Sequence, residues 1–329
     1  MAGPLRLVFM GSDPIALPLL DWLAGPGASA ASLVGVVTGP DRPSGRGQAV
    51  RPNAVRAWTL GRPIPVLQPG KLDAEALGSL TALGPDVALV VAYGQILREA
   101  FISVPRLGTL NLHASLLPRY RGASPIQTAV ASGDTETGLS LMRIVRELDA
   151  GPVADVERVP IGPLDTALEV ETRLAAAAIP LVARALPRLA DGSLEFVAQD
   201  ASRASFCRRL DKEDGTLDFT QPARLLAARI NGLNPWPSAG LLLEGTPVKV
   251  GLADWQDTHR AAPGTLLEPD AAGLRIACAS GVLRLLRLQR AGGRMLEAPE
   301  FLRGFPVRAG AVVESQPMAA LVSPAPFRR

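Results

Sequence analysis

Residues 108–126 read GTLNLHASLLPRYRGASPI, and this stretch indicates the class of fold. Its apolar start predicts a buried strand over 108–112, with Asn111 and His113 at the end of that strand. Residues i and i+2 of an extended chain project from the same face, so we expect the two side chains to point together. In an open α/β sheet, ligands bind at the carboxyl ends of the strands. The polar pair therefore marks a candidate site.

The segment after the pair predicts a turn and then a helix. Pro118 directs the chain out of the strand, and Gly122 can adopt a positive φ. The helical pattern begins near Ser124 or Pro125. An isolated Asn-x-His pair is more often a strand end whose polar groups cap neighbouring backbone than a functional site, so other segments must decide between the two interpretations.

Apolar runs alternate with helical patterns through the first half of the chain. The predicted strands are Leu5–Met10, Leu33–Thr38, Pro85–Ala92 and Gly108–Leu112. Runs of this length, separated by segments of helical period, are typical of a parallel sheet covered on both faces. We therefore expect a doubly wound, Rossmann-like α/β domain.

A long helical pattern over 166–189 ends this half, and the hydrophobic pattern of the sequence then changes. Short apolar segments separated by Gly- and Pro-containing turns follow a single further helix over 223–230; they lie at 240–243, 247–251, 264–267, 274–277 and 282–288. This spacing predicts a small β-barrel of the oligonucleotide-binding (OB) type. We expect an α/β domain over 1–190, a linker over 191–207, an OB-like domain over 208–316 and a loosely ordered tail over 317–329.

Composition narrows the class of protein. A chain of 329 residues with 47% hydrophobic content can form two cores. Cys207 and Cys278 are far apart and lack C-x-x-C spacing, which argues against a disulfide framework or a zinc site and favours a reducing compartment. No run of eighteen apolar residues occurs. We expect a cytoplasmic monomer without metal or membrane contact.

Charge is balanced overall but uneven locally. The chain has 34 basic and 31 acidic side chains, and two stretches over 42–56 and 275–308 are rich in arginine. A solvated face and a phosphate-binding surface are equally good interpretations of such stretches. Residues 39–47 lack the Lys-Ser/Thr ending of a phosphate-binding loop, so nucleotide hydrolysis has no support. We expect a mobile, irregular basic loop there.

A third element is the segment Arg146–Val153, which reads RELDAGPV and places Asp149 in a turn before a strand. An Asp in such a turn is by itself usually a turn former. With Asn111 and His113 it supplies an acid, an imidazole and an amide. These groups are sufficient to move a proton and to stabilise an oxyanion without a Ser or Cys nucleophile.

These segments together resemble the folate-dependent formyltransferases, whose pattern is N-x-H-x-S-L-L-P-x-x-x-G followed by L-D-x-G. Further matching segments are Pro40–Gly47, Val90–Gly94, Leu116–Gln127 and Asn234–Pro237. One such segment would be weak support, but all of them in order are specific. One departure lies near the start, where the family usually has Gly-Thr-Pro and this chain has Gly11-Ser12-Asp13-Pro14.

The resemblance implies an enzyme that transfers a formyl group from 10-formyltetrahydrofolate to the α-amine of methionine on initiator tRNA. Such a transfer passes through a tetrahedral oxyanion, which Asn111 and His113 would stabilise, while Asp149 would orient His113 and help to move the proton. Similarity assigns the folate site to Ser115, Leu116, Leu117 and Pro118, with backbone near Gln95, Ile96 and Leu97. We expect Arg42, Arg46, Arg51, Arg287 and Arg290 to contact the tRNA.

Two alternatives remain open. A formyltransferase acting on a sugar-nucleotide amine would share the same three polar residues and a similar plan of two domains; the loop around Arg42 and the segment Asn234–Pro237 favour the tRNA substrate. A non-catalytic folate- or RNA-binding protein would not need Asn111, His113 and Asp149 together.

Overall fold

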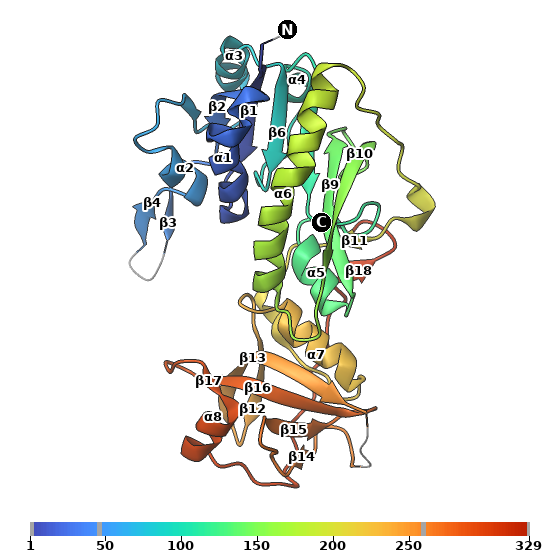
Figure 1. Ribbon diagram of the computed structural model, residues 1–329. Coiled ribbons are helices and arrows are strands. Elements are labelled where there is room, and N and C mark those ends of the chain that lie inside the picture. The colour runs from blue at the N-terminus through green and yellow to red at the C-terminus, as the bar shows by residue number, and fades with distance from the viewer. Residues whose placement is uncertain (1–2, 45–47, 258–260, 328–329) are drawn as a thin grey trace. The chain divides into compact units, whose positions relative to one another are not determined.

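The computed structural model describes residues 3–44, 48–257 and 261–327 (Figure 1). Two compact units divide the chain, and each draws on several segments. The first holds residues up to Arg121 with Gly138–Val159 and Thr172–Ala204. The second holds Gly122–Thr137, Pro160–Glu171 and the residues from Ser205 on. Among the described residues, no helix combines the length and the apolar character that crossing a membrane requires.

The first unit is built on a sheet of seven strands in the order β10-β9-β7-β6-β1-β2-β5. The strands are β1 Leu5–Gly11, β2 Ala31–Val37, β5 Val66–Leu67, β6 Val87–Val91, β7 Thr109–His113, β9 Glu136–Arg143 and β10 Val153–Pro160. Strands β5, β2, β1, β6 and β7 are parallel, and β9 runs antiparallel to β7. The predicted parallel, doubly wound sheet is thereby confirmed.

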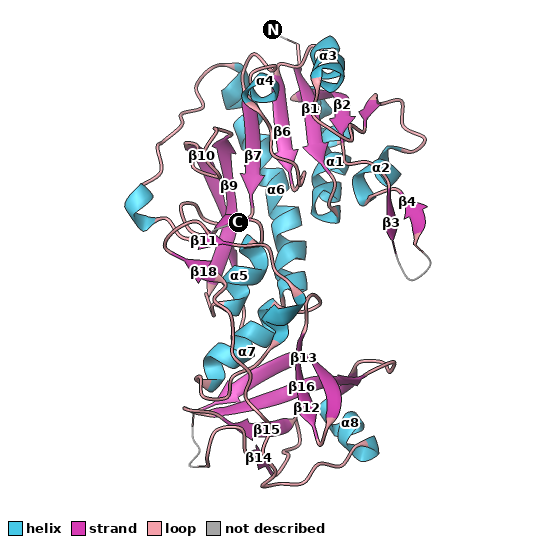
Figure 2. Cartoon of the chain, turned by 180° about the vertical axis from the view of Figure 1, so that it is seen from behind, coloured by secondary structure: helices cyan, strands magenta, loops and turns pink. Residues whose placement is uncertain are grey.

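Helices cover both faces of this sheet. They are α1 Leu17–Ala24, α2 Ala54–Thr59, α3 Ala74–Ala82, α4 Glu99–Ile102 and α6 Ala167–Ala190. Side chains alternate along β1, so Val8 and Met10 share a face, where they pack with Leu80 of α3 and Phe101 of α4. Figures 1 and 2 show α1 and α6 on the opposite face. Burial on both faces explains why these strands read as continuous apolar runs.

The second unit holds an antiparallel sheet in the order β12-β13-β16-β15-β14, with β17 beside β16. Its strands are β12 Ala239–Leu243, β13 Thr246–Gln256, β14 Leu266–Leu267, β15 Leu274–Ala277, β16 Val282–Arg290 and β17 Leu296–Glu297. Its helices are α5 Pro125–Ala131, α7 Ala223–Gly232 and α8 Ala298–Gly304. The sheet curls into a half-barrel around an apolar core that includes Leu226 and Ile230 of α7 (Figure 2). This matches the OB-like class expected from the turn spacing.

The chain beyond Pro317 is more ordered than the sequence predicts. Val322–Ser323 form a strand, β18, that pairs antiparallel with β11, Phe206–Cys207. Leu321 is buried, and Thr216 Oγ1 donates a hydrogen bond to the Pro317 carbonyl at 2.7 Å. In the small sheet, β11 also neighbours β8, Arg121–Gly122. The expectation of a loosely ordered tail is therefore wrong for residues 321–323, which long-range pairing and burial hold in place; residues 328 and 329 lie outside the described residues.

The basic segment after β2 also differs from the expected irregular loop. It forms an antiparallel hairpin of β3, Arg42–Ser44, and β4, Ala49–Arg51. Elsewhere the described residues form short 3-10 helices: η1 Pro14–Ala16, η2 Pro26–Ser29, η3 Ala201–Arg203 and η4 Lys212–Gly215. The ladder gives regular structure to the two arms, whereas residues 45–47 lie outside the described residues.

The unusual Gly11-Ser12-Asp13-Pro14 turn has a clear local role. Ser12 Oγ accepts the Gly39 backbone N–H at 3.0 Å, which ties the turn to the segment leading into the hairpin. The Asp13 carboxylate accepts the Ile15 N–H at 3.1 Å and caps η1. The departure from the family sequence thus supplies two side chains that satisfy orphan backbone donors.

Candidate active site

The candidate site lies at the carboxyl edge of the parallel strands. β6 and β7 are parallel neighbours with Val90 opposite Asn111, so the segments that follow them, 92–98 and 114–120, leave the sheet side by side. Ala92 and Gly94 both have positive φ, which turns the first segment sharply after β6. The fold therefore brings two loops and the end of β7 to one edge.

Asn111 and His113 occupy alternate positions of β7. Asn111 is half-buried and lies opposite Met142 of β9, whereas His113 is buried and lies opposite Ser140. The pleat of the strand puts the two side chains on the same face, as the sequence predicts.

The two ring nitrogens of His113 have different partners. Nε2 lies 2.9 Å from the Tyr120 carbonyl oxygen, which can only accept, so Nε2 carries a hydrogen and donates it. Nδ1 faces the Asp149 carboxylate, with Oδ2 at 3.7 Å. That separation is longer than a direct hydrogen bond. The structure thus brings His113 and Asp149 together and leaves Nδ1 as the nitrogen that can gain or lose a proton.

The loop after β7 is fixed by hydroxyl groups. Ser115 Oγ donates to the Arg119 carbonyl at 2.5 Å, and Ser140 Oγ donates to the Ser115 carbonyl at 2.7 Å. Ser140 Oγ also accepts the Leu117 N–H at 3.0 Å. Ser115 is fully buried, so its side chain shapes the turn, while Leu116, Leu117 and Pro118 are only half-buried.

Asp149 sits in a tight turn with φ of 49°. Gly151 is needed in this turn because a Cβ there would lie 1.8 Å from the Arg143 carbonyl oxygen. Gln199 Nε2 donates to the carbonyls of Asp149 and Gly151, at 2.8 and 2.7 Å. Gln199 Oε1 accepts from Arg121 Nη2 at 2.7 Å. Sequence reasoning missed this chain of bonds, because nothing links Gln199 to Asp149 before the chain folds.

Arg121 is a buried cation close to the site, 7% exposed. Burial lowers the pKa of its guanidinium, and the Asp149 carboxylate opposes that effect. Arg121 therefore adds positive charge beside Asp149. The only sequence signal for it was its place in the matching segment Leu116–Gln127.

The segment after β6 presents one large apolar side chain to solvent. Ile96 is 67% exposed, whereas Gln95 and Leu97 are half-buried. Gln95 Nε2 reaches the Pro69 carbonyl at 3.5 Å, a weak hydrogen bond. Residues 95–97 therefore border the same edge of the sheet as 115–118.

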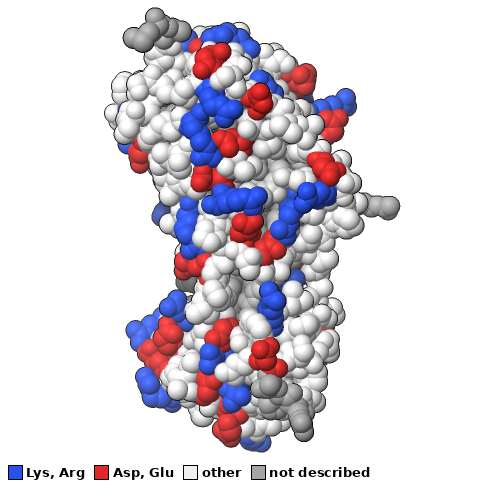
Figure 3. Space-filling view, turned by 45° about the vertical axis from the view of Figure 1, so that its right-hand side comes forward, with Lys and Arg blue, Asp and Glu red and all other residues white. Residues whose placement is uncertain are grey.

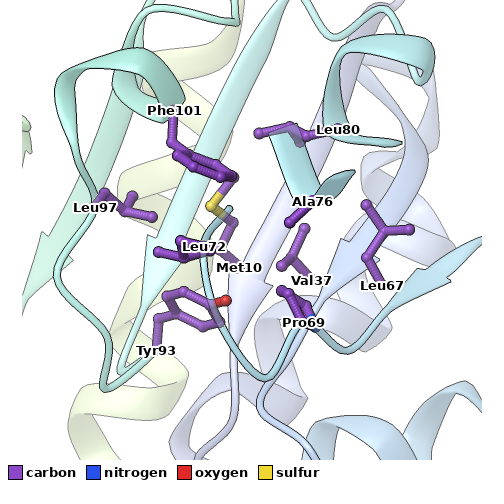
Figure 4. A pocket seen from close by; sticks show the side chains of 10 residues that line it. All are labelled: Met10, Val37, Leu67, Pro69, Leu72, Ala76, Leu80, Tyr93, Leu97 and Phe101. Atoms are coloured by element: carbon purple, nitrogen blue, oxygen red, sulfur yellow. The ribbon is translucent and has the colours of Figure 1, made fainter. Parts of the chain in front are cut away.

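A small apolar cavity lies behind this segment (Figure 4). Leu97 and Tyr93 border it together with Met10 of β1, Leu80 of α3 and Phe101 of α4. It has room for about one water molecule. The Tyr93 hydroxyl is buried there without a hydrogen-bond partner among the described residues, and burial raises its pKa to about 12. The cavity is thus a packing feature of the core and too small for a folate.

The arginines expected to meet tRNA lie in different surroundings. Arg42 and Arg51 are exposed and directly opposite each other across the hairpin. Arg46 lies outside the described residues. On β16, Arg287 pairs with Glu297 at 2.8 Å, and the Arg290 guanidinium lies 6.0 Å from the Phe305 ring.

Neither cysteine contributes to the candidate site. Cys207 and Cys278 are buried free thiols, and burial raises the pKa of Cys278 to about 11. The described part of the chain contains no group of three or more His, Cys, Asp or Glu side chains placed to hold a metal ion.

Comparison with known proteins identifies relatives over most of the chain. A "Methionyl-tRNA formyltransferase" of Aromatoleum aromaticum is 41% identical over 310 residues, which cover 94% of this chain and 97% of the relative. A protein of the same name from Pseudomonas syringae pv. tomato is 44% identical over 297 residues, covering 90% and 93%.

Solved structures share the fold at low identity. A Helicobacter canadensis N-formyltransferase in complex with folinic acid and dTDP-3-aminofucose has a TM-score of 0.62 at 15% identity, covering 85% of this chain and 99% of its own. HypX from Aquifex aeolicus in complex with tetrahydrofolic acid has a TM-score of 0.60 at 13% identity, and covers 91% of this chain and 47% of its own. These similarities show the fold alone.

Two family models match in order along the chain. The "Formyl transferase" model matches residues 5–186, and the "Formyl transferase, C-terminal domain" model matches residues 209–306. Together with the relatives, these matches show that the chain belongs to the formyl transferase family.

Proposed function

We propose that this chain is an enzyme that transfers the formyl group of 10-formyltetrahydrofolate to the free α-amine of methionyl-tRNA, which prepares the initiator for translation. The observation that carries the proposal is identity of 41 to 44% over at least nine tenths of the chain with relatives named for this reaction. The His113–Asp149 pair at a strand end supplies the chemistry that such a reaction needs.

The residues of the site divide the chemical work. The Asn111 amide donates to the formyl oxygen as negative charge develops on it. His113 is held by the bond from Nε2 to the Tyr120 carbonyl, and its Nδ1 handles the proton that leaves the attacking amine. Asp149 stabilises the charged imidazole. A water molecule or the amine itself bridges the 3.7 Å between Nδ1 and the carboxylate.

The residues present fit a folate. A pterin has apolar faces and polar edges, and two loops at the sheet edge offer half-buried or exposed apolar side chains beside backbone amides. We assign the faces to Ile96, Leu97, Leu116 and Leu117, with Pro118 at the rim and backbone near Gln95 at the polar edge. Ser115 contributes through the turn that it closes. When bound, the folate supplies the activated formyl group.

The acceptor is a polyanion, and Arg42 and Arg51 are suited to bind it. Like charges directly opposite each other on a hairpin repel, and a phosphate between them relieves that repulsion. Figure 3 shows acidic and basic side chains interspersed over the face in view, so that face carries no broad surface of a single sign. We therefore assign tRNA contact to specific arginines: Arg42, Arg46, Arg51, Arg287 and Arg290.

A sugar-nucleotide amine is the second candidate acceptor. Solved structures with this fold include sugar N-formyltransferases, but at 14 and 15% identity they speak only to the fold. A non-catalytic role is disfavoured because a simple binder has no use for a carboxylate facing a buried imidazole. Monomeric state and cytoplasmic location stay predictions that light scattering and cell fractionation can check.

The test is an acceptor comparison with purified protein and 10-formyltetrahydrofolate. Methionine charged on initiator tRNA should become formylated, whereas free methionine and a nucleotide-linked 3-amino sugar should not. Formylation of the amino sugar at a comparable kcat/KM would replace the tRNA assignment with the alternative. Binding of folate and tRNA without any transfer would support the non-catalytic role.

A further inference from the structure

The turn that carries Asp149 is held by a side chain fifty positions further along the chain. Gln199 Nε2 donates two hydrogen bonds, to the Asp149 carbonyl at 2.8 Å and to the Gly151 carbonyl at 2.7 Å. One amide group thereby binds the backbone of the turn on both sides of Ala150. Nearby, the Val153 N–H donates to the Val197 carbonyl at 2.8 Å and the Val197 N–H donates back at 2.9 Å, so the segment carrying Gln199 lies against the turn.

The orientation of the Gln199 amide is fixed by Arg121. A guanidinium can only donate, so the oxygen of the amide must face Arg121, and it accepts from Nε at 3.1 Å and from Nη2 at 2.7 Å. The amide nitrogen must then face the two carbonyls, which can only accept. A flipped amide would leave all four contacts wrong. The network therefore has a single arrangement.

The turn needs such support because its backbone is unfavourable. Asp149 has φ of 49°, in the left-handed region that residues with a Cβ rarely occupy. The Ala150 N–H donates to the Glu147 carbonyl at 3.3 Å, but loss of the two bonds from Gln199 would weaken the hold on these backbone angles. The Asp149 carboxylate would then move relative to Nδ1 of His113, from which it now lies 3.7 Å away.

Two consecutive residues, Tyr120 and Arg121, position both His113 and Asp149. The Tyr120 carbonyl accepts from Nε2 of His113, and the next residue, Arg121, orients Gln199 and so the Asp149 turn. His113 is thus positioned by the Tyr120 backbone and the Asp149 turn, through Gln199, by the Arg121 side chain.

We propose that Gln199 is a positioning residue of the formyl transfer: it holds the Asp149 carboxylate at its working distance from His113, and Arg121 keeps the Gln199 amide in the required orientation. This inference rests on the roles proposed above for His113 and Asp149. Gln199 touches neither substrate in this scheme, so its replacement should affect turnover and leave substrate binding intact.

The first test is Gln199→Met, which keeps the size of the side chain and removes its donors. We expect kcat to fall by about tenfold or more, because small misplacement of a reacting group is enough for such a decrease. KM for 10-formyltetrahydrofolate and for methionyl-tRNA should stay within about twofold of wild type. Gln221→Met is the matched control: Gln221 is also partly buried and its side chain donates to the nearby Asp218 at 3.3 Å, so its replacement should leave kcat unchanged.

A second variant separates positioning from folding. Gln199→Glu keeps the bond to Arg121 but turns a carboxylate oxygen toward the Asp149 and Gly151 carbonyls. Its kcat should fall as that of Gln199→Met does, while circular dichroism and the thermal midpoint show a folded protein. Wild-type kcat in either folded variant would overturn the inference.

The deciding measurement is a double-mutant cycle with Asp149→Asn. If Gln199 acts through Asp149, then Gln199→Met should lower kcat little further once the carboxylate is gone. Equal decreases in both backgrounds would mean a general structural effect and would overturn the inference. If Asp149→Asn alone keeps wild-type kcat, the proposed role of Asp149 itself fails, and that outcome is distinct from a failure of Gln199 alone.

Discussion

His113 uses its two ring nitrogens differently: Nε2 makes a hydrogen bond, and Nδ1 faces a carboxylate. The Tyr120 carbonyl can only accept, so the hydrogen on Nε2 is held in the bond to that carbonyl. Proton exchange therefore falls to Nδ1, next to Asp149. Asn111 differs in kind: it is half-buried on the same face, and its amide has no charge to gain or lose. The two residues should respond differently to replacement.

Asn111→Ala should lower kcat by about 100-fold, equivalent to about 3 kcal/mol of transition-state stabilisation, with little change in the free energy of unfolding. His113→Ala should lower kcat as well, and in addition lower the free energy of unfolding by about 1 kcal/mol or more, because it removes the buried hydrogen bond from Nε2 to the Tyr120 carbonyl. Single-turnover kinetics and urea unfolding measure the two effects. A near wild-type rate would contradict the proposed role of the replaced residue: oxyanion stabilisation for Asn111, proton transfer for His113.

Tyr93 allows a test of the cavity through pH. Its hydroxyl is buried without a partner among the described residues, so Tyr93→Phe should raise the free energy of unfolding by about 1 kcal/mol at pH 7. Burial raises the pKa of Tyr93 from 10.0 to about 12, so the folded state holds this proton more tightly than the unfolded state. Wild-type stability should therefore fall, relative to Tyr93→Phe, as the pH rises from about 10 to about 12. Urea unfolding of both proteins across this pH range measures the difference in their free energies of unfolding. A difference that does not change with pH would contradict the burial of the Tyr93 hydroxyl.

Residue-scale prediction from sequence works where neighbours along the chain are neighbours in space. Asn111 and His113 share a strand face because the strand repeats every two residues, and the sequence shows this directly. Gln199 and Arg121 come together only through the fold, 78 positions apart. No local pattern encodes that contact.

Secondary structure elements were likewise predicted where the local sequence determines them and missed where a distant partner does. Strands β1, β2, β6 and β7 and the helices α6 and α7 lie within a few residues of their predicted bounds, because burial gives each a clear hydrophobic pattern. The hairpin of β3 and β4 and the tail strand β18 escaped prediction. Their strands are two or three residues long and depend on a partner strand, so their own composition reads as loop.

Asn231 links two elements of the second unit. From the last turn of α7, its Nδ2 donates to the Ala253 carbonyl and its Oδ1 accepts the Ala253 N–H, both at 2.9 Å. Ala253 lies where the ladder between β13 and β16 shifts register, so the Asn231 side chain pairs both backbone groups of a residue at the bulge.

Asn231→Ala should therefore lower the free energy of unfolding by about 2 kcal/mol or more, since two backbone groups at a buried site are left without partners. Asn231→Asp should also be destabilising, because the donor is removed and a charge is buried. Chemical unfolding followed by circular dichroism gives the values. Changes below about 0.5 kcal/mol in both variants would mean that the bulge is satisfied in another way.

At the scale of the whole molecule, balanced charge makes the placement of each cation important. The formal net charge is only +3, and several arginines are engaged in ion pairs, such as Arg284 with Asp254 and Asp270 and Arg184 with Asp155 and Glu157. Arg287 is likewise held by Glu297. A phosphate must compete with that carboxylate, whereas Arg42 and Arg51 face each other with repulsion that a phosphate relieves.

Arg42→Leu should weaken binding of methionyl-tRNA and reduce the slope of log K against log salt concentration by about one for each phosphate that the variant no longer neutralises. Formylation of charged tRNA should fall more than slow hydrolysis of the formyl donor, which needs no tRNA. Arg106→Leu is the control: Arg106, just before β7, is exposed and pairs with Asp86, just before β6, at the sheet edge away from the candidate site. Its replacement should leave the slope unchanged. The measurement is tRNA binding over a range of salt concentrations for the wild type and both variants. If Arg42→Leu keeps both the slope and the tRNA reaction, the hairpin is only a solvated element, and recognition of tRNA belongs to the arginines of β16.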